Sequence, residues 1–196
     1  GVQTCALPIF AVIYTHSHVD HYGGVRGVVD EAGVMTGKVK VYAPAGFMEE
    51  AVSENIMAGN AMSRRASYIY GNLLKANVKG QVGAGLGTTT SAGKVTLIAP
   101  IHAITKDGQK EIIDGLTYDF MLAPGSEAPS EMLWYVEEKK LIEAAENVTH
   151  TLHNNYSLRG AKIHDPLAWS KYINNALDRW GDKAEIIVQG VSDVLC

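Results

Sequence analysis

Three imidazoles and one carboxylate lie within the stretch Thr15-His16-Ser17-His18-Val19-Asp20-His21. The apolar run 11–14 precedes this stretch, and two glycines follow it at positions 23 and 24. An apolar run followed by polar residues and then glycines is typical of a buried strand, a loop and the start of a helix. The sequence therefore predicts that a buried strand carries this group of side chains at its end.

The spacing of these side chains suits metal binding. His16 and His18 are two residues apart, so in extended chain both leave the same side of the backbone. Asp20 and His21 follow in a predicted turn, so one metal ion could take the first pair and a second ion the other pair. Imidazole with carboxylate suits zinc, with iron and manganese as alternatives. Incidental loop histidines are the other interpretation, but the density of ligand-type residues favours a metal site.

The composition is that of a globular protein with one domain. The chain has 196 residues, of which 46% are hydrophobic and 19% are charged, and this length suits a sizeable core. The net charge is −4 and the basic residues are scattered, so we expect no nucleic-acid partner. No apolar run approaches the length of about 18 residues that a membrane span needs. Cys5 and Cys196, the two cysteines, do not support a disulfide framework.

Periodicity and turn residues divide the rest of the chain into short elements. Helices are predicted over 23–32, 47–58, 60–74 and 166–180, the last with Asp165 as its N-cap. In the second of these helices, Glu49, Glu50 and Glu54 are expected to face outward. Strands are predicted over 38–43, 95–98, 116–122, 132–136, 141–145 and 185–188, the last of them buried. The strands between 95 and 145 are expected to pair antiparallel in succession.

Two later glutamates are candidates for the second half of a metal site. Glu127 lies in a tight turn between two predicted strands, and Glu146 lies at the end of an apolar strand. Either residue alone would more commonly be a surface carboxylate. The histidine motif changes this balance, because a two-metal site needs ligands that residues 16–21 do not supply. A bridging carboxylate commonly holds two cations about 3.5–4 Å apart.

Further polar residues follow Glu146. His150 and His153 are interpreted either as ligands on a helix or as residues that orient ligands or substrate. Arg159 is a candidate anion clamp, because its planar fork matches a pair of sulfate or phosphate oxygens, with a surface arginine as the alternative. His164 could donate a proton to a leaving group or stabilise its charge.

Two regions are candidates for contact with a substrate. The glycine-rich loop 79–93 is interpreted either as a flexible connector or as a loop whose amides and hydroxyls bind an anion. Tyr70 and Asn72 are candidate substrate-binding residues. Met57, Met62, Tyr70 and Leu73 could line an apolar groove, and plain core is the other interpretation of these four.

The stretch 15–21 resembles the His-X-His-X-Asp-His signature of the metallo-β-lactamase superfamily. The segments 60–68, 125–132, 145–154 and 165–170 are similar to the alkyl sulfatase branch, the zinc enzymes that hydrolyse linear alkyl sulfates such as dodecyl sulfate. The resemblance runs in register from about residue 11 to residue 188.

The resemblance implies an α/β fold, the αββα sandwich, with two Zn²⁺ ions. By the family pattern, one zinc is held by His16, His18 and Glu127. The other is held by Asp20 and His21, and Glu146 bridges the two. Arg159 matches a sulfate-contacting arginine, and His164 matches a histidine that assists the departing sulfate. Asp20 and His164 are therefore the expected catalytic residues.

The chain departs from the family pattern at its ends. After the strand 185–188 the family has a histidine that completes the second zinc site, but Val191 stands about there and cannot bind zinc. Residues 1–10 resemble a translated sequencing adapter and are expected to be non-native, as is the tail 190–196. We therefore expect a partial catalytic domain over 11–189, with the sandwich incomplete at both ends. The family's opening strands, dimerisation region and C-terminal lipid-carrier-like domain are also expected to be missing.

The expected function is hydrolysis of an alkyl sulfate ester by metal-activated water. Attack at carbon with cleavage of the C–O bond is what the resemblance suggests. The alternatives are another hydrolase of the superfamily, a lactonase or phosphodiesterase, or an inactive truncated fragment. The resemblance also implies that full-length relatives are homodimers, and it suggests a periplasmic or secreted location.

Overall fold

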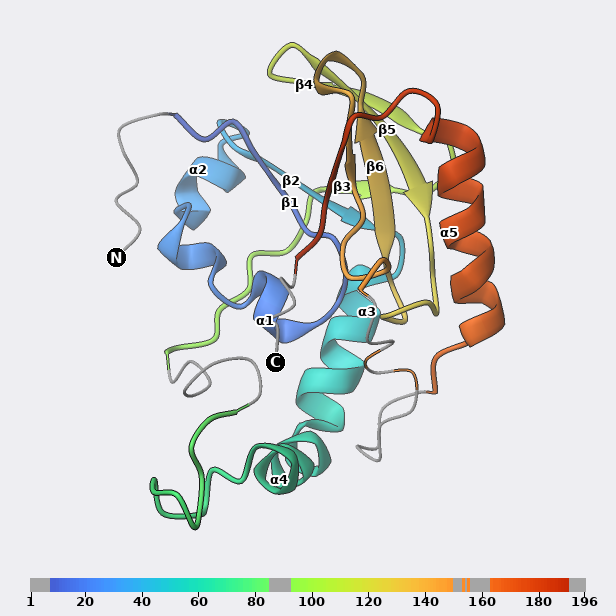
Figure 1. Cartoon of the computed structure of the whole chain (residues 1–196). Coiled ribbons are helices and arrows are strands. Elements are labelled where there is room, and N and C mark those ends of the chain that lie inside the picture. Colours follow the sequence, from blue (N-terminus) through green and yellow to red (C-terminus); the bar gives the residue numbers. More distant parts are fainter. Residues whose placement is uncertain (1–7, 85–92, 150–152, 154, 156–162, 191–196) are drawn as a thin grey trace.

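Two β-sheets lie face to face, and helices cover the outer face of each (Figure 1). The structure, a computed structural model, describes residues 8–84, 93–149, 153, 155 and 163–190. These four layers are the α/β sandwich that the sequence predicted.

The first sheet has three parallel strands, β1 (Ala11–Ile13), β2 (Lys40–Pro44) and β3 (His102–Ile104). Side chains alternate between its two faces, as the pleat of a strand requires. Val12 and Tyr14 pack with the helices, whereas Ala11 and Ile13 pack with the second sheet. Strand β1 is therefore partly buried on both of its faces directly before the histidine motif.

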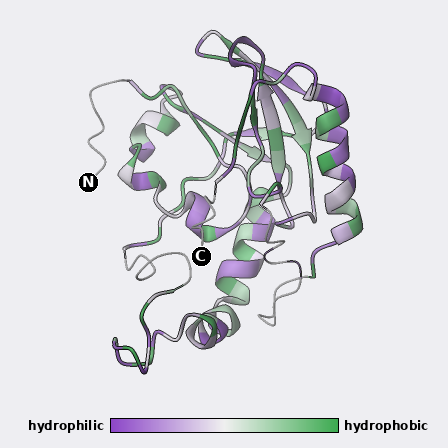
Figure 2. Cartoon of the chain, viewed as in Figure 1, coloured by the Kyte–Doolittle hydropathy of each residue, from purple (hydrophilic) through white to green (hydrophobic). Residues whose placement is uncertain are grey.

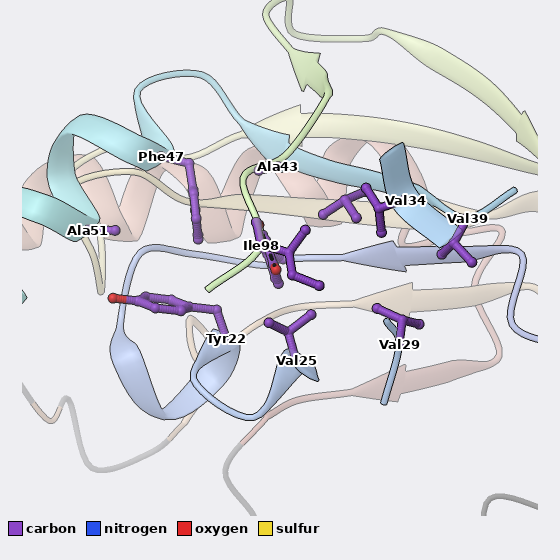
Figure 3. Packing of buried hydrophobic residues seen from close by; sticks show 11 residues of the cluster. Tyr22, Val25, Val29, Val34, Val39, Ala43, Phe47, Ala51 and Ile98 are labelled. Carbon is purple, nitrogen blue, oxygen red and sulfur yellow. Dashed lines mark hydrogen bonds between the residues drawn. The ribbon is translucent and has the colours of Figure 1, made fainter. Parts of the chain in front are cut away.

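Short helices cover the outer face of this sheet. They are α1 (Val19–Tyr22), η1 (Val25–Gly27), α2 (Glu31–Met35) and α3 (Phe47–Val52). Figure 3 shows their apolar side chains meeting those of the sheet. Phe47 stacks on Tyr14 with ring centroids 4.9 Å apart. Burial of this cluster fixes the position of α1, and α1 carries part of the motif.

The second sheet has the strand order β4-β5-β6-β7-β8. Its strands are β4 (Lys110–Ile113), β5 (Leu116–Leu122), β6 (Met132–Val136), β7 (Leu141–Glu143) and β8 (Ile186–Val188). The short helix η3 (Glu137–Lys139) connects β6 to β7. All neighbours pair antiparallel except β7 and β8, which are parallel. Every residue of β6 is buried, because one face meets the first sheet and the other meets α5.

Helix α5 (Pro166–Trp180) forms the fourth layer. The side chain of Asp165 accepts hydrogen bonds from the backbone N–H groups of Leu167 and Ala168 at 2.9 and 3.0 Å, as an N-cap does. Trp169, Ala176 and Trp180 are buried on the sheet side, and Figure 2 shows the hydrophilic stripe on the opposite side.

Helix α4 (Gly59–Tyr70) differs from α5, because none of its residues is buried. A turn of π-helix, η2 (Ser53–Met57), connects it to α3. Met57 and Leu73 are 82% and 85% exposed, so the core interpretation of these residues is wrong.

The sequence located most of the second sheet correctly. The predictions for β5, β6 and α5 are confirmed residue for residue, and the predicted strand 38–43 corresponds to β2. The predicted helix 23–32 is wrong, because η1 and α2 divide this region. Residues 95–98 are not a strand, although Ile98 is buried.

Two strands were missed, and two other strand predictions need correction. The sequence analysis missed β3 and β4. The strand 141–145 ends at Glu143, two residues before Ala145 adopts a φ of +50°. The last strand is not buried, because β8 lies at the edge of the sheet with Ile186 and Ile187 about half exposed. Of the helices that the structure describes, none combines the length and apolarity that a bilayer crossing requires.

Candidate metal centre

The histidine motif begins where β1 crosses to the second sheet. The backbone N–H of Met132 donates to the carbonyl of Thr15 at 3.0 Å, and the N–H of Ser17 donates to the carbonyl of Ser130 at 3.1 Å. Between these bonds, His16 pairs with Glu131 in an isolated antiparallel bridge. His16 is therefore held between the sheets and is fully buried.

Asp20 and His21 lie on helix α1, not in the predicted turn, because α1 begins at Val19 inside the motif. The helix directs the ring of His21 inward, and its Nε2 is 3.1 Å from Oε1 of Glu146. The side chain of Asp20 is 71% exposed and its Oδ2 is 3.5 Å from the same Nε2. Asp20 is thus adjacent to the cluster but not inside it.

The two glutamates come from the second sheet, as the sequence predicted. Glu127 lies in the turn between β5 and β6, where Gly125 adopts a φ of +76° that favours glycine. Glu146 follows β7, directly after Ala145. Both glutamates are buried.

Four side chains converge between the sheets. Oε2 of Glu127 is 3.0 Å from Nδ1 of His18 and 3.5 Å from Nε2 of His16. The same Nε2 of His16 is 3.7 Å from Oε2 of Glu146. These four residues each offer one ligand atom, and the four atoms lie within 4.8 Å of one another. The structure therefore brings together His16, His18, Glu127 and Glu146, with His21 in contact through Glu146.

The surroundings of His16 fit a cation. Its Nδ1 is 2.9 Å from Oγ1 of Thr15, whereas its buried Nε2 has no hydrogen-bond partner among the described residues. Burial lowers the pKa of His16 well below 6.5, so the ring is neutral. With Nδ1 donating to Thr15, Nε2 directs a lone pair at two carboxylates. A metal ion among these atoms would satisfy the nitrogen and both carboxylates together.

His153 contacts both glutamates. Its Nε2 is 3.2 Å from Oε1 of Glu127 and 3.2 Å from Oε2 of Glu146, and its Nδ1 is 2.9 Å from Oγ1 of Thr149. Hydrogen bonds to Glu127 and Glu146 raise the pKa of His153 to about 10. Burial raises the pKa of Glu146, but hydrogen bonds from His153 and His21 outweigh it and bring the pKa to about 2. Without metal, a protonated His153 supplies positive charge to the two carboxylates.

Glu54 is a site residue that sequence reasoning missed. It was expected to face outward, yet it is 3% exposed and its Oε2 is 3.7 Å from Nε2 of His18. The reason is the π-turn η2, marked by a hydrogen bond from Ala58 N to Ser53 O, which changes the helical register. An α-helical period applied across this turn could not have found it.

His164 lies near the contact between His18 and Glu54. It is buried, and its ring is stacked with that of His18 at a centroid distance of 6.2 Å. His18, Glu54 and His164 also offer atoms within 4.8 Å of one another. His18 is therefore shared between the glutamate cluster and this smaller group.

The other predicted site residues are not in the cluster. Tyr70 ends α4 and Asn72 follows it, and no hydrogen bond or ion pair joins either to the cluster within the part of the chain that the structure describes. Their interpretation as substrate-binding residues stays a prediction. His150, Arg159 and Val191 lie outside the described residues.

The layered fold and the buried cluster at the ends of its strands define the class. The chain belongs to the metallo-beta-lactamase superfamily, whose sequence profile matches residues 6–191. The resemblance found in the histidine motif is thereby confirmed.

Relatives of known activity narrow the class. Over 180 residues the chain is 71% identical to a linear primary-alkylsulfatase of a Pseudomonas species, covering 92% of this chain and 27% of that protein. It is 51% identical to an alkyl/aryl-sulfatase of Saccharomyces cerevisiae, covering 92% of this chain and 28% of that protein. These relatives confirm the resemblance to the alkylsulfatase branch.

Solved structures agree with this grouping. The stereoselective inverting sec-alkylsulfatase of a Pseudomonas species superposes with a TM-score of 0.87 at 45% identity, covering 95% of this chain and 30% of that chain. A metallo-beta-lactamase of Hirschia baltica, at 17% identity, shares the fold with a TM-score of 0.54, covering 95% and 63% of the two chains. The chain spans less than a third of the length of the alkylsulfatases it matches.

Proposed function

We propose that this chain carries the metal-binding core of a zinc-dependent alkylsulfatase. The reaction is hydrolysis of an alkyl sulfate ester, in which water and the ester give an alcohol and hydrogen sulfate. The observation that carries the proposal is the convergence of His16, His18, Glu127 and Glu146 in a chain 71% identical to a linear primary-alkylsulfatase.

The ligand assignment follows from which atoms lie together. His16, His18 and Glu127 would hold one zinc ion, because their facing atoms are 3.0 to 3.5 Å apart around Oε2 of Glu127. Asp20 and His21 would hold a second ion, and Glu146 would bridge the two, because its two oxygens face His21 and His16 separately. Zinc held there would lower the pKa of a bound water to about 7, which would supply hydroxide at neutral pH.

The protein's own side chains orient the proposed ligands and are proposed to neutralise the charge of the departing sulfate. Thr15 contacts Nδ1 of His16 and the buried Glu54 contacts Nε2 of His18, so that the other nitrogen of each ring faces Glu127. His164 is proposed to stabilise the charge of the departing sulfate or to donate a proton to it, because it is buried beside His18. Arg159 is proposed as the contact to the sulfate on its sequence alone.

The test combines zinc content with sulfate release from dodecyl sulfate. It uses this chain and a version extended at both ends to the length of its relatives. We expect the extended protein to hold about two zinc ions and to release sulfate. We expect this chain to release far less.

A lactone and a phosphodiester serve as competing substrates for the extended protein. Zinc binding without sulfate release, but with hydrolysis of either competitor, would keep the metal centre and overturn the substrate. Absence of zinc from both proteins would overturn the metal centre itself.

A further inference from the structure

One buried glutamate outside the proposed ligand set holds the turn that carries Glu127. Glu131 directly precedes β6 and is 1% exposed. Its Oε2 accepts hydrogen bonds from the hydroxyl of Ser126 and the backbone N–H of Ala128, both at 2.8 Å. Ser126 and Ala128 flank Glu127 in the chain, so these bonds fix the backbone on both sides of a proposed ligand.

The other oxygen of Glu131 reaches the segment that carries Glu146. Oε1 accepts from Nδ2 of Asn147 at 2.7 Å, and Asn147 directly follows Glu146. The carbonyl of Asn147 in turn accepts from Nε1 of Trp169 at 2.8 Å, which anchors this segment to α5. One side chain thus joins two ligand-bearing segments that β6 and β7 separate in the chain.

The backbone around Glu131 joins a third segment. Glu131 itself pairs with His16. On either side of His16, the N–H of Ser17 donates to the carbonyl of Ser130, and the N–H of Met132 donates to the carbonyl of Thr15. The segments of His16, Glu127 and Glu146 therefore meet at a single residue that lies outside the cluster of facing nitrogen and oxygen atoms.

We propose that Glu131 is the positioning residue of the metal centre, and that its side chain sets the separation of the Glu127 and Glu146 carboxylates around His16. The inference rests on the proposed metal site. Without the Glu131 carboxylate, the N–H of Ala128 and Nδ2 of Asn147 lose their acceptor, whereas the hydroxyl of Ser126 keeps the carbonyl of Ala123 at 2.6 Å. Both glutamate segments can then relax to new positions. Outer contacts of this kind change metal affinity by about 10- to 100-fold in other proteins.

The test measures zinc affinity by competition with a chromophoric chelator, and coordination geometry by the visible absorption of bound Co²⁺. We expect Glu131→Leu to weaken zinc binding by at least about tenfold and to change the Co²⁺ spectrum. Glu131→Gln should stay within about threefold of the unaltered chain. Its carbonyl can still accept from Ser126 and Ala128. Its NH₂ can donate to Oδ1 of Asn147 once the Asn147 amide turns over, because that oxygen is buried and has no hydrogen-bond partner among the described residues.

Asp119→Leu is the matched control. Asp119 is also a buried carboxylate of the second sheet, but it accepts from Trp180 Nε1 at 3.1 Å and pairs with Arg179 on the α5 side. We expect this variant to lose thermal stability and to keep its zinc affinity within about threefold. A role of Glu131 in general stability alone would make the two leucine variants behave alike.

The outcomes separate this inference from the proposed function. Normal zinc affinity in folded Glu131→Leu, or an equal loss in Asp119→Leu, overturns the inference alone. Absence of zinc from both this chain and the extended protein overturns the metal site and the inference with it. If Glu131→Leu does not fold, Asn147→Ala decides, because it removes only the link to Glu146. About fivefold weaker binding supports the inference and unchanged binding overturns it.

Discussion

Asp119 and Glu127 are buried carboxylates eight residues apart around β5, and their surroundings are opposite. Asp119 pairs with Arg179, which keeps its charge at any pH that proteins survive, and also accepts from Trp180. Glu127 faces His16, His18 and His153, whose charge depends on protons and on bound metal. The first carboxylate is neutralised by the protein alone, whereas the second belongs to the proposed metal site, where a cation would replace protons as the positive charge.

The largest effect is expected from Glu127→Gln. This change keeps the side-chain volume but removes the charge that two histidines and a cation would share. We expect zinc affinity to fall by about 100-fold or more, with the protein still folded. Chelator competition measures the affinity and circular dichroism the fold. A loss smaller than tenfold would contradict the assignment of Glu127 as a ligand.

Asp119→Leu tests the other side of the comparison. It leaves Nε1 of Trp180 without its acceptor, and it leaves the exposed Asp107, 3.4 Å away, as the ion-pair partner of Arg179 among the described residues. We expect the free energy of unfolding to fall by about 2 kcal/mol. Urea denaturation of the metal-free protein measures this change. Unchanged stability would show that the pair with Arg179 contributes nothing net.

Glu54 is intermediate between Glu127, a proposed ligand, and Asp119, which does not contact the site. It contacts the proposed ligand His18 from outside the cluster. We expect Glu54→Leu to weaken zinc binding about tenfold, since Nε2 of His18 loses the carboxylate that orients the ring. Glu54→Gln keeps an acceptor and should weaken binding by only about threefold. Equal affinities for both variants and the unaltered chain would remove Glu54 from the metal centre.

The pH dependence of the metal-free protein gives a smaller effect. The raised pKa of His153, about 10, contributes stability that is complete below pH 6.5 and is lost as the pH rises towards 10. The lowered pKa of His16 reduces the stability of the folded protein below pH 6.5. The pKa of Glu146, lowered to about 2, causes a further loss of stability as the pH falls below 4.5. Taken by themselves, these three groups place maximal stability near pH 6.5. Burial raises the pKa of Glu143 to about 7, and this adds stability that is lost as the pH rises from 4.5 to 7.

Thermal melts from pH 4 to 10, with and without zinc, measure this dependence. Zinc should abolish the loss above pH 6.5, because the cation replaces the proton on His153 as the positive charge beside the glutamates. A metal-free protein whose stability rises steadily from pH 6.5 to 10 would contradict the contacts of His153.

The smallest effect is expected from breaking an exposed ion pair beside the same sheet. Glu185 pairs with Lys140 at 2.5 Å, with more than half of each side chain exposed. Lys140→Ala should leave the melting temperature within about 2 °C and zinc affinity unchanged, because solvent screens such pairs. A larger shift would show that the edge beside β8 is more tightly coupled to the fold than its exposure indicates.

Local patterns in the sequence predicted the parts of the site that depend on local chemistry. The histidine motif was recognisable because ligand-type side chains are concentrated after an apolar strand. Glu127 and Glu146 were recognisable because each follows a strand whose apolar pattern is clear, and β5 has the predicted bounds. Their contact with His16 is a tertiary fact, and it was predicted only through the resemblance to a family.

The errors in the predicted elements occur where hydrophobic periodicity is too short to be recognised or does not determine burial. Strands β3 and β4 have three and four residues, too few for an alternating pattern to emerge. The pattern of α4 showed which residues share a face but not whether anything covers that face. The apolar strand β8 read as buried because composition cannot distinguish an edge strand from a central one.

The π-turn η2 makes the position of Glu54 beside the proposed metal centre sensitive to the loss of a single residue. A π-turn behaves as a one-residue insertion into an α-helix, and each residue turns the helix by about 100°. Loss of a single codon here, such as that for Ser53, would restore an unbroken α-helix and rotate the carboxylate of Glu54 away from His18. At this edge of the site, a change in gene length therefore acts on chemistry as directly as a change of residue.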